Sequence, residues 1–288
     1  MSLFERVAPT PQDFDDPVLV AQMDGWIDAG GGGATALAHL LSVIPTEPLV
    51  RFDNDTLVDY RARRPTMRIA DGVNVGLNWP EIELRAGHDR TGRAVLVLHG
   101  PEPDFHWHTF TDAVLDLARE LGVSILCGLG AFPAPVPHTR PVRLAATAGN
   151  RRLADLVGFV SGTIEVPTGI GGALESHFHA AGIDAVGLWA RVPHYVAAMP
   201  YPAAAAALLE TLVEVTGLEI DVRDLHAAAA LTDARIDELI ANSEEHAALV
   251  QQLETTVDTT EAAPIDPTTL PSGDELAAEL ERFLRGEL

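Results

Sequence analysis

Short apolar runs alternate with longer stretches of helical periodicity along the first two thirds of the chain. The short runs are rich in Val, Leu, Ile and Ala, which is typical of strands buried within a sheet, and the longer stretches carry apolar residues at helical spacing. This alternation predicts a layered α/β domain. The expected strands are 18–23, 48–53, 80–85, 95–98, 123–129, 142–147 and 185–190, and the expected helices are 34–43, 109–121 and 171–181.

The pattern changes after residue 202, where alanine and acidic residues dominate and the strand pattern ends. Helices are expected there over 203–215, 221–230 and 232–253. A segment rich in Thr, Pro and Asp then predicts a flexible linker, and the last residues form an amphipathic helical pattern that would dock on the body or on a partner. The predicted organisation is a core domain over 1–202, a helical region over 203–254, a linker over 255–273 and a C-terminal amphipathic helix over 274–288.

Composition excludes several classes of function. The chain of 288 residues contains no lysine, so its 19 basic residues are all arginine, and enzymes that need a P-loop or Schiff-base lysine are ruled out. A net charge of -23 disfavours nucleic acid and anionic membranes as partners. Cys127 is the single cysteine, which excludes an intrachain disulfide. No signal peptide or membrane-length apolar run is apparent, so we expect a cytoplasmic protein.

A glycine-rich loop follows the first expected strand. Four consecutive glycines, Gly30, Gly31, Gly32 and Gly33, lead directly into a helix. Bare glycine amides at a helix N-terminus can bind an anion such as phosphate. The spacing matches neither the P-loop nor the dinucleotide fingerprint, and such glycines often only let a helix pack tightly on its sheet. Both interpretations, anion site and structural turn, therefore stand.

Four polar segments follow expected strands, where α/β sheets usually bind ligands. They are 24–33, 99–108, 130–143 and, with a weaker signal, 191–201. The third is stiffened by prolines around His138, Thr139 and Arg140. The candidate proton-transfer residues are Asp28, His99 and His138, and the candidate anion-binding residues are Gly30 to Gly33, Thr139 and Arg140. The alternative is an interface loop in which Arg140 pairs with a carboxylate of a neighbouring subunit.

Histidine spacing suggests a metal only weakly. Asp104, His106 and His108 alternate, but three candidate ligands next to aromatic residues also describe an edge segment with a polar outer face. His177 and His179 point apart on a helix, and a lone Glu175–His179 pair is far more often a surface hydrogen bond. We therefore expect no metal centre and no cofactor.

Taken in order, several motifs resemble the proteasome assembly chaperone 2 family in its actinobacterial branch. They are Gly25–Gly30, Gly100–Asp104 followed by Trp107 and Phe110, Pro137–Pro141, Pro167–Leu174 and the tail from Leu270 to Arg285. The resemblance covers nearly the whole chain. It implies a three-layer α/β/α core similar to phosphorylase/hydrolase-like folds, a C-terminal helical extension, and a homo-oligomer for which a trimer is one candidate.

The same resemblance implies a function in binding or assembling another protein. Eukaryotic members of the family dock into proteasome pockets through a C-terminal hydrophobic-Tyr-X motif. This chain has Glu287 where the tyrosine would stand, so it departs from that motif. The alternative is a small-molecule enzyme or ligand sensor with a nucleoside phosphorylase/hydrolase-like site, which rests on analogy of fold alone.

Overall fold

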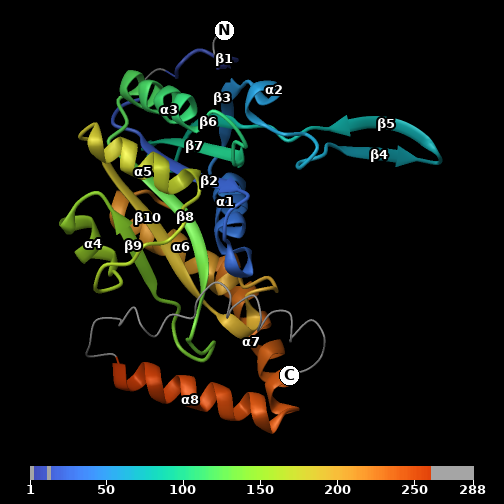
Figure 1. The fold of residues 1–288 in the computed structure, drawn as a ribbon, viewed down its shortest axis with the longest axis vertical. Coiled ribbons are helices and arrows are strands. Elements are labelled where there is room, and N and C mark those ends of the chain that lie inside the picture. Colours follow the sequence, from blue (N-terminus) through green and yellow to red (C-terminus); the bar gives the residue numbers. More distant parts are fainter. Residues whose placement is uncertain (1–2, 12–13, 261–288) are drawn as a thin grey trace.

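The computed structural model describes residues 3–11 and 14–260 (Figure 1). The strands are β1 (Phe4–Arg6), β2 (Val18–Asp24), β3 (Thr46–Phe52), β4 (Thr66–Ala70), β5 (Val73–Asn78), β6 (Glu83–His88), β7 (Ala94–Pro101), β8 (Ile125–Ala134), β9 (Leu144–Ala148) and β10 (Asp184–Pro193). The helices are α1 (Gly32–Val43), α2 (Asn54–Leu57), α3 (Trp107–Leu121), α4 (Arg151–Val157), α5 (Ile170–Ala180), α6 (Pro202–Thr216), α7 (Arg223–Ala241) and α8 (Glu244–Thr260), with short 3-10 turns η1 (Ala29–Gly31) and η2 (His194–Val196).

One eight-stranded sheet organises the molecule. Its strand order is β1-β3-β6-β7-β2-β8-β10-β9, and the central strands β7, β2, β8 and β10 are parallel. The strands towards the two edges, β1, β3, β6 and β9, pair antiparallel. Strands β8 and β10 pair over ten residues and extend well beyond the end of β2. The loops that follow the parallel strands therefore begin at different positions along the strand direction.

Helices cover both faces of the sheet, which confirms the expected three-layer α/β/α core. In β2 the alternate residues Val18 and Val20 belong to a core with α1 and α6, whereas Leu19 and Ala21 belong to a core with α3 and α5. Both faces of the strand are buried, which explains its nearly continuous apolar sequence. Helix α3 ends at Gly122 in the left-handed region, as its C-terminal glycine predicts.

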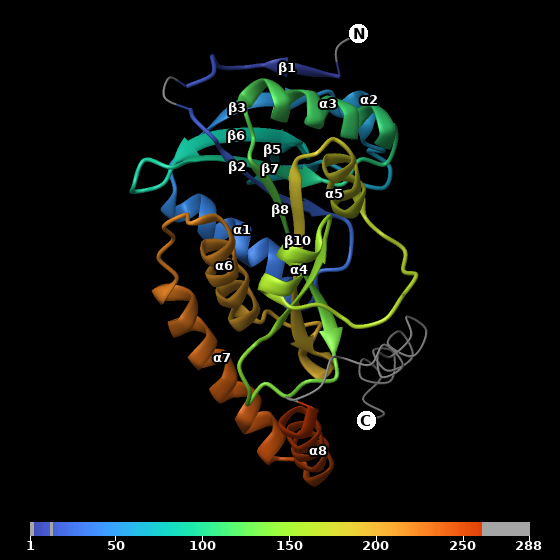
Figure 2. The same ribbon diagram turned by 90° about the vertical axis from the view of Figure 1, so that its left-hand side faces the viewer.

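The first helix after residue 202 is a component of this core. Leu208, Leu209 and Leu212 of α6 are fully buried in the same cluster as α1 and β2. The alanine-rich sequence makes this possible, because small side chains such as Ala204 let α6 approach the glycines of α1 closely. Helix α7 adds Leu225 and Ile236 to the same cluster, and α8 lies at the end of the molecule opposite β1 (Figure 2).

The helix boundaries near the C-terminus differ from the expected ones. Residues 223–241 form one helix through Leu231, and the break falls at Asn242–Ser243, where the Ser243 hydroxyl accepts a hydrogen bond from the His246 amide. Helix α8 continues to Thr260, so the expected linker does not begin at residue 255. In the last turns of α8 the hydroxyl groups of Thr255, Thr256 and Thr259 donate hydrogen bonds to carbonyl groups four residues earlier, so these threonines are compatible with a helix. The rest of the expected linker and the helix 274–288 lie outside the described residues.

The sequence analysis missed the hairpin of β4 and β5, which projects from the body (Figure 1). Its two-residue turn is Asp71-Gly72, and both residues have positive φ, at 48° and 81°. An Asp-Gly pair between apolar residues is a strong hairpin signal. The expected strand 80–85 starts only at Glu83, because Pro80 has no amide hydrogen and the Ile82 amide donates to the Asn54 side chain instead.

No helix among the described residues is long and apolar enough to span a membrane.

Candidate functional site

Asp28 occupies the anion-binding position of the glycine-rich loop with its own carboxylate. The amides of Gly33 and Ala34, at the start of α1, donate to its two carboxylate oxygens at 2.7 and 2.9 Å. Burial raises the pKa of Asp28, although these two amide hydrogen bonds oppose the shift. A helix N-terminus attracts a negative group. Here that group comes from the protein itself.

The glycines of the loop allow close packing. Gly30 has φ +62°, and a methyl group on it would lie 2.7 Å from the Cβ of the buried Tyr201. Its amide donates to the Ala197 carbonyl, and its carbonyl accepts from the Tyr201 amide. Gly32 and Gly33 face β8 and α6 at similarly short range, and only Gly31 has open space around it. This geometry supports the structural interpretation of the loop.

His99 lies in β7, beside Glu83 of β6. Its Nε2 is buried without a hydrogen-bond partner and lies 3.9 Å from Glu83 Oε2. Burial lowers the pKa of His99 below its ordinary value of 6.5, and Arg85 adds to this effect, while Glu83 and Asp24 oppose it. The imidazole is therefore held in its neutral form.

We expect His99 to make stability depend on pH. The unfolded chain takes up the histidine proton near pH 6.5, whereas the folded protein resists it, so stability falls as the pH drops through 6.5. The free energy of unfolding of the wild type should therefore fall more than that of His99→Gln between about pH 7.5 and about pH 5.5. Urea unfolding of both proteins at each pH measures this difference. If the free energy of unfolding falls equally in the two proteins, His99 does not cause the pH dependence.

His138 is buried between the core and α7. Its Nδ1 lies 2.8 Å from the Tyr195 hydroxyl, and its Nε2 lies 3.0 Å from Asp237 Oδ1. The backbone amide of His138 also donates to the Tyr195 hydroxyl. Burial raises the pKa of Tyr195 to about 12, so that hydroxyl stays protonated at neutral pH. The imidazole thus connects the loop after β8 with η2 and α7.

Thr139 and Arg140 bind helix α8 of the same chain. The guanidinium of Arg140 forms a two-pronged pair with Asp258, with both distances at 2.8 Å, and also contacts Glu254 at 3.1 Å. The Thr139 hydroxyl donates to Glu254 as well. The hydrogen bonds to Asp258 raise the pKa of Arg140 further. Arg140 does clamp carboxylates, but they belong to α8 and not to a neighbouring subunit.

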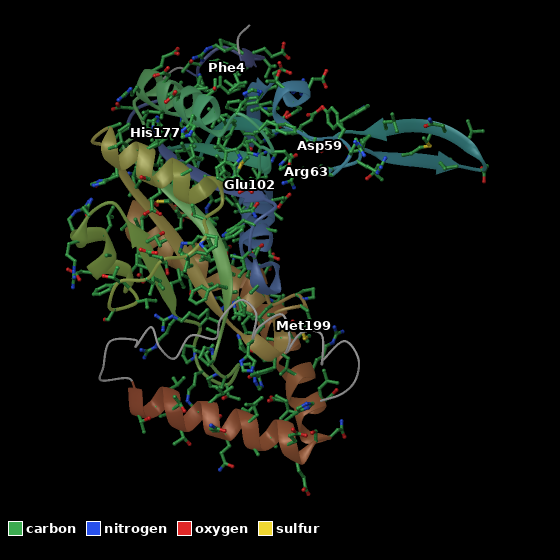
Figure 3. The ribbon with its side chains drawn as sticks, viewed as in Figure 1. Phe4, Asp59, Arg63, Glu102, His177 and Met199 are labelled. Carbon is green, nitrogen blue, oxygen red and sulfur yellow. The ribbon has the colours of Figure 1, made fainter. Side chains whose placement is uncertain are left out.

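The candidate residues do not form one site. Asp28 caps α1, His99 lies beside Glu83, and His138 and Arg140 contact the C-terminal helices. Among the described residues, no group of three or more His, Cys, Asp or Glu side chains could hold a metal ion. Asp104 instead accepts hydrogen bonds from the Asp59 amide and the Arg63 guanidinium. Figure 3 shows Asp59 and Arg63 at the base of the projecting hairpin.

A small cleft lies between the end of β2 and the start of α5. Asp28, Glu102 and Glu175 line it, together with Trp26. Glu102 accepts a hydrogen bond from the Ile170 amide at 2.6 Å, and burial raises the pKa of Glu175. The cavity measures about 60 Å³. Sites for small organic ligands usually span roughly 300–1,000 Å³, so a nucleoside does not fit this cleft as it stands.

The β4–β5 hairpin, which the sequence analysis left unassigned, gathers exposed apolar side chains on one short element. Every residue of both strands is exposed. The large apolar side chains on it are Met67, Ile69, Val73, Val75 and Leu77, which are 45–62% exposed. Its base is held by the contact between Tyr60 and Trp79, with ring centroids 4.9 Å apart, and by the Arg63–Asp104 ion pair.

Comparison with known proteins places the chain among related structures. The PAC2 family model matches residues 22–240. The Mycobacterium tuberculosis protein of unknown function Rv2714 is 37% identical, covers 96% of each chain and superposes with a TM-score of 0.86. Rv2125 of the same organism, described as a proteasome-assembly chaperone homologue, is 38% identical over 81% of this chain and 99% of its own, with a TM-score of 0.75.

A more distant structure shares the fold. Pyrococcus furiosus PbaB, described as an archaeal proteasome activator, is 18% identical over 83% of this chain and 99% of its own, with a TM-score of 0.63. A comparison with curated proteins found no match.

Proposed function

The chain belongs to the PAC2 family, and from that premise we propose that it acts in the cytoplasm by binding other protein chains, with the β4–β5 hairpin as its contact arm. The observation that carries this proposal is the exposure of five large apolar side chains on a hairpin that stands away from the core. Family membership and the description of Rv2125 as a proteasome-assembly chaperone homologue support a role in protein assembly.

The physical argument is that an isolated hairpin is poorly suited to remain exposed. Two strands alone are only marginally stable in water, and contiguous apolar patches on a protein surface usually mark an interaction site. The hairpin gains stability when its apolar side chains are covered by a second protein. The Asp-Gly turn and the anchored base hold it in an extended position from which it can reach a partner.

We infer that the first such partner is a second copy of the chain. Identical subunits usually assemble with closed symmetry, and in a ring an arm of one subunit packs on the next. A trimer is one such ring. A different client protein, such as a proteasome subunit, would then bind the assembled oligomer.

The enzyme alternative lacks a supporting observation. Asp28 and His138 bond to structural partners, His99 lies apart from both of them, and the cleft beside Asp28 measures about 60 Å³. Of the candidate anion-binding residues, Gly33, Thr139 and Arg140 already donate to the protein's own carboxylates.

The test replaces apolar side chains on the arm without disturbing its backbone. We expect Ile69→Thr combined with Val73→Thr to dissociate the oligomer and to abolish co-purification of a stoichiometric partner. Both residues are about 60% exposed and threonine keeps a high strand propensity, so the thermal midpoint of the subunit should barely change. Native mass spectrometry of protein captured from its own cells reads out subunit number and partners.

A matched control removes exposed apolar side chains elsewhere. Leu231→Gln combined with Leu239→Gln alters α7 at residues that are 70% and 62% exposed, and the oligomer should persist. If the hairpin variant retains the same subunit number and the same partners as the wild type, the hairpin is not the contact arm.

A further inference from the structure

An open pocket of about 420 Å³ lies at the edge of the sheet, between α4, α6 and the end of β10. Arg143 and Arg191 contribute to its lining from the sheet side, and Glu210 and Glu214 contribute from α6. Its volume falls within the usual range for small-molecule sites. Neither arginine was among the candidate site residues of the sequence analysis, because each appears there as a single basic residue near the end of a strand.

The two arginines lie on neighbouring segments of backbone. The Arg191 amide donates to the Arg143 carbonyl at 3.0 Å, just beyond the pairing of β10 with β9. Like charges on directly neighbouring strands destabilise a sheet. Burial lowers the pKa of Arg191 to about 10, and the charge of Arg143 adds to this shift. Burial and the neighbouring charge of Arg143 thus both act against the charged form of Arg191.

Arg191 is incompletely satisfied. Its Nη2 donates to the Leu144 carbonyl at 3.3 Å, but its Nε is buried without a hydrogen-bond partner. A buried guanidinium nitrogen without a partner is unfavourable, and a bound carboxylate would remove this cost through a charge-assisted hydrogen bond. The sheet side of the pocket thus offers a place for a carboxylate.

The α6 side carries the opposite charge. Glu210 and Glu214 lie one helical turn apart and both are exposed. Glu210 pairs with His226 at 2.7 Å, whereas Glu214 has no ion pair within the described part of the chain. Glu214 is therefore available to an ammonium group. The lining also includes the apolar residues Val142, Leu144, Leu156, Val157 and Phe159.

We propose that this pocket binds a small zwitterion with an apolar body, namely an apolar amino acid or dipeptide. Its carboxylate is held by Arg191, its ammonium group by Glu214, and its apolar side chain by the wall around Phe159. Opposite charges on facing walls select a molecule that carries both charges over one that carries a single charge, because an anion alone would face the glutamates. This ligand site lies apart from the hairpin and goes beyond the proposed function.

Isothermal titration of the full chain with four probes tests the proposal. The probes are leucine, leucyl-leucine, N-acetyl-leucine and leucinamide. We expect leucine or leucyl-leucine to bind and the two singly charged analogues to bind at least about tenfold more weakly, as the loss of one charge-assisted bond predicts. Which of the two zwitterions binds more tightly identifies the ligand length. Absence of binding by all four probes at millimolar concentration overturns the proposal.

Two substitutions locate the binding in this pocket. Arg191→Met should weaken the better zwitterion at least about tenfold, and Glu214→Gln should weaken it without weakening N-acetyl-leucine. Arg119→Met, which removes an exposed arginine of α3, should leave the affinity unchanged. Thermal unfolding checks that each variant folds. If Arg191→Met does not fold, Glu214→Gln still provides the test, because residue 214 lies on an exposed helical surface. Unchanged affinity in folded Glu214→Gln, or equal binding of leucine and N-acetyl-leucine, would contradict the two-charge site.

Discussion

Gly30→Ala is expected to lower the free energy of unfolding by about 3 kcal/mol. About 1 kcal/mol arises because the residue has φ +62°, where any side chain is strained, and about 2 kcal/mol arises from overpacking a buried contact. The added methyl group would lie 2.7 Å from the Cβ of Tyr201, which is almost fully buried and cannot move away freely. Urea unfolding followed by circular dichroism measures the loss.

The chain offers a matched control one residue further on. Gly31 has nearly the same backbone conformation, with φ +60°, but the nearest atom to an added methyl group is the Thr35 hydroxyl at 3.9 Å. Gly31→Ala should therefore lose only the backbone part, about 1 kcal/mol. The difference between the two variants measures the packing of the loop on Tyr201. Equal losses would show that the loop is not constrained by close packing at Gly30.

Asp28→Ala is expected to destabilise the protein by about 2 kcal/mol, because two amides at the start of α1 lose their acceptor. The effect should appear in the free energy of unfolding of the subunit. A catalytic or ligand-binding aspartate would instead affect activity or ligand binding and leave folding nearly unchanged. Asp28→Asn, which keeps one side-chain oxygen as an acceptor, should lose about half as much.

Asp24→Ala serves as the control for Asp28→Ala. Asp24 is an exposed carboxylate close enough to raise the pKa of Asp28, and its backbone carbonyl accepts a hydrogen bond from the Glu102 amide. Its replacement should leave stability nearly unchanged. If Asp24→Ala and Asp28→Ala destabilise the protein equally, general charge in the loop, and not capping of α1, accounts for the loss.

The helices and strands could be predicted from the sequence where an element is buried, because burial restricts its positions to apolar residues. The strand at 18–23 and the helix at 109–121 were predicted almost to their ends, because buried strands need unbroken apolar residues and Gly122 terminates the helix. The strands of the β4–β5 hairpin were not predicted, because every residue in them is exposed and their apolar residues do not form a continuous buried run. Its Asp71-Gly72 turn was the signal that could have identified it.

The candidate site shows the limit of reading polar residues one at a time. The sequence predicted an anion beside Gly30 to Gly33 and a carboxylate at Arg140, and the structure places the Asp28 carboxylate on the Gly33 amide and α8 carboxylates on Arg140. It could not indicate that the anion is Asp28 itself or that the carboxylates are on α8, because a partner is chosen by proximity in space. Asp258 is 118 residues from Arg140 along the chain.

By itself, then, the sequence determined the alternation of strands and helices, the membership of a layered α/β class, and the exclusion of lysine chemistry, since these depend on local periodicity and on residue types. Only the tertiary structure decided which charges neutralise each other and which remain unpaired. Arg140 and Arg191 look alike in the sequence, but the fold gives the first two carboxylates and leaves the second with a buried nitrogen that lacks a partner. Electrostatic and hydrogen-bonding partners are properties of distances in the folded chain, and no local pattern encodes them.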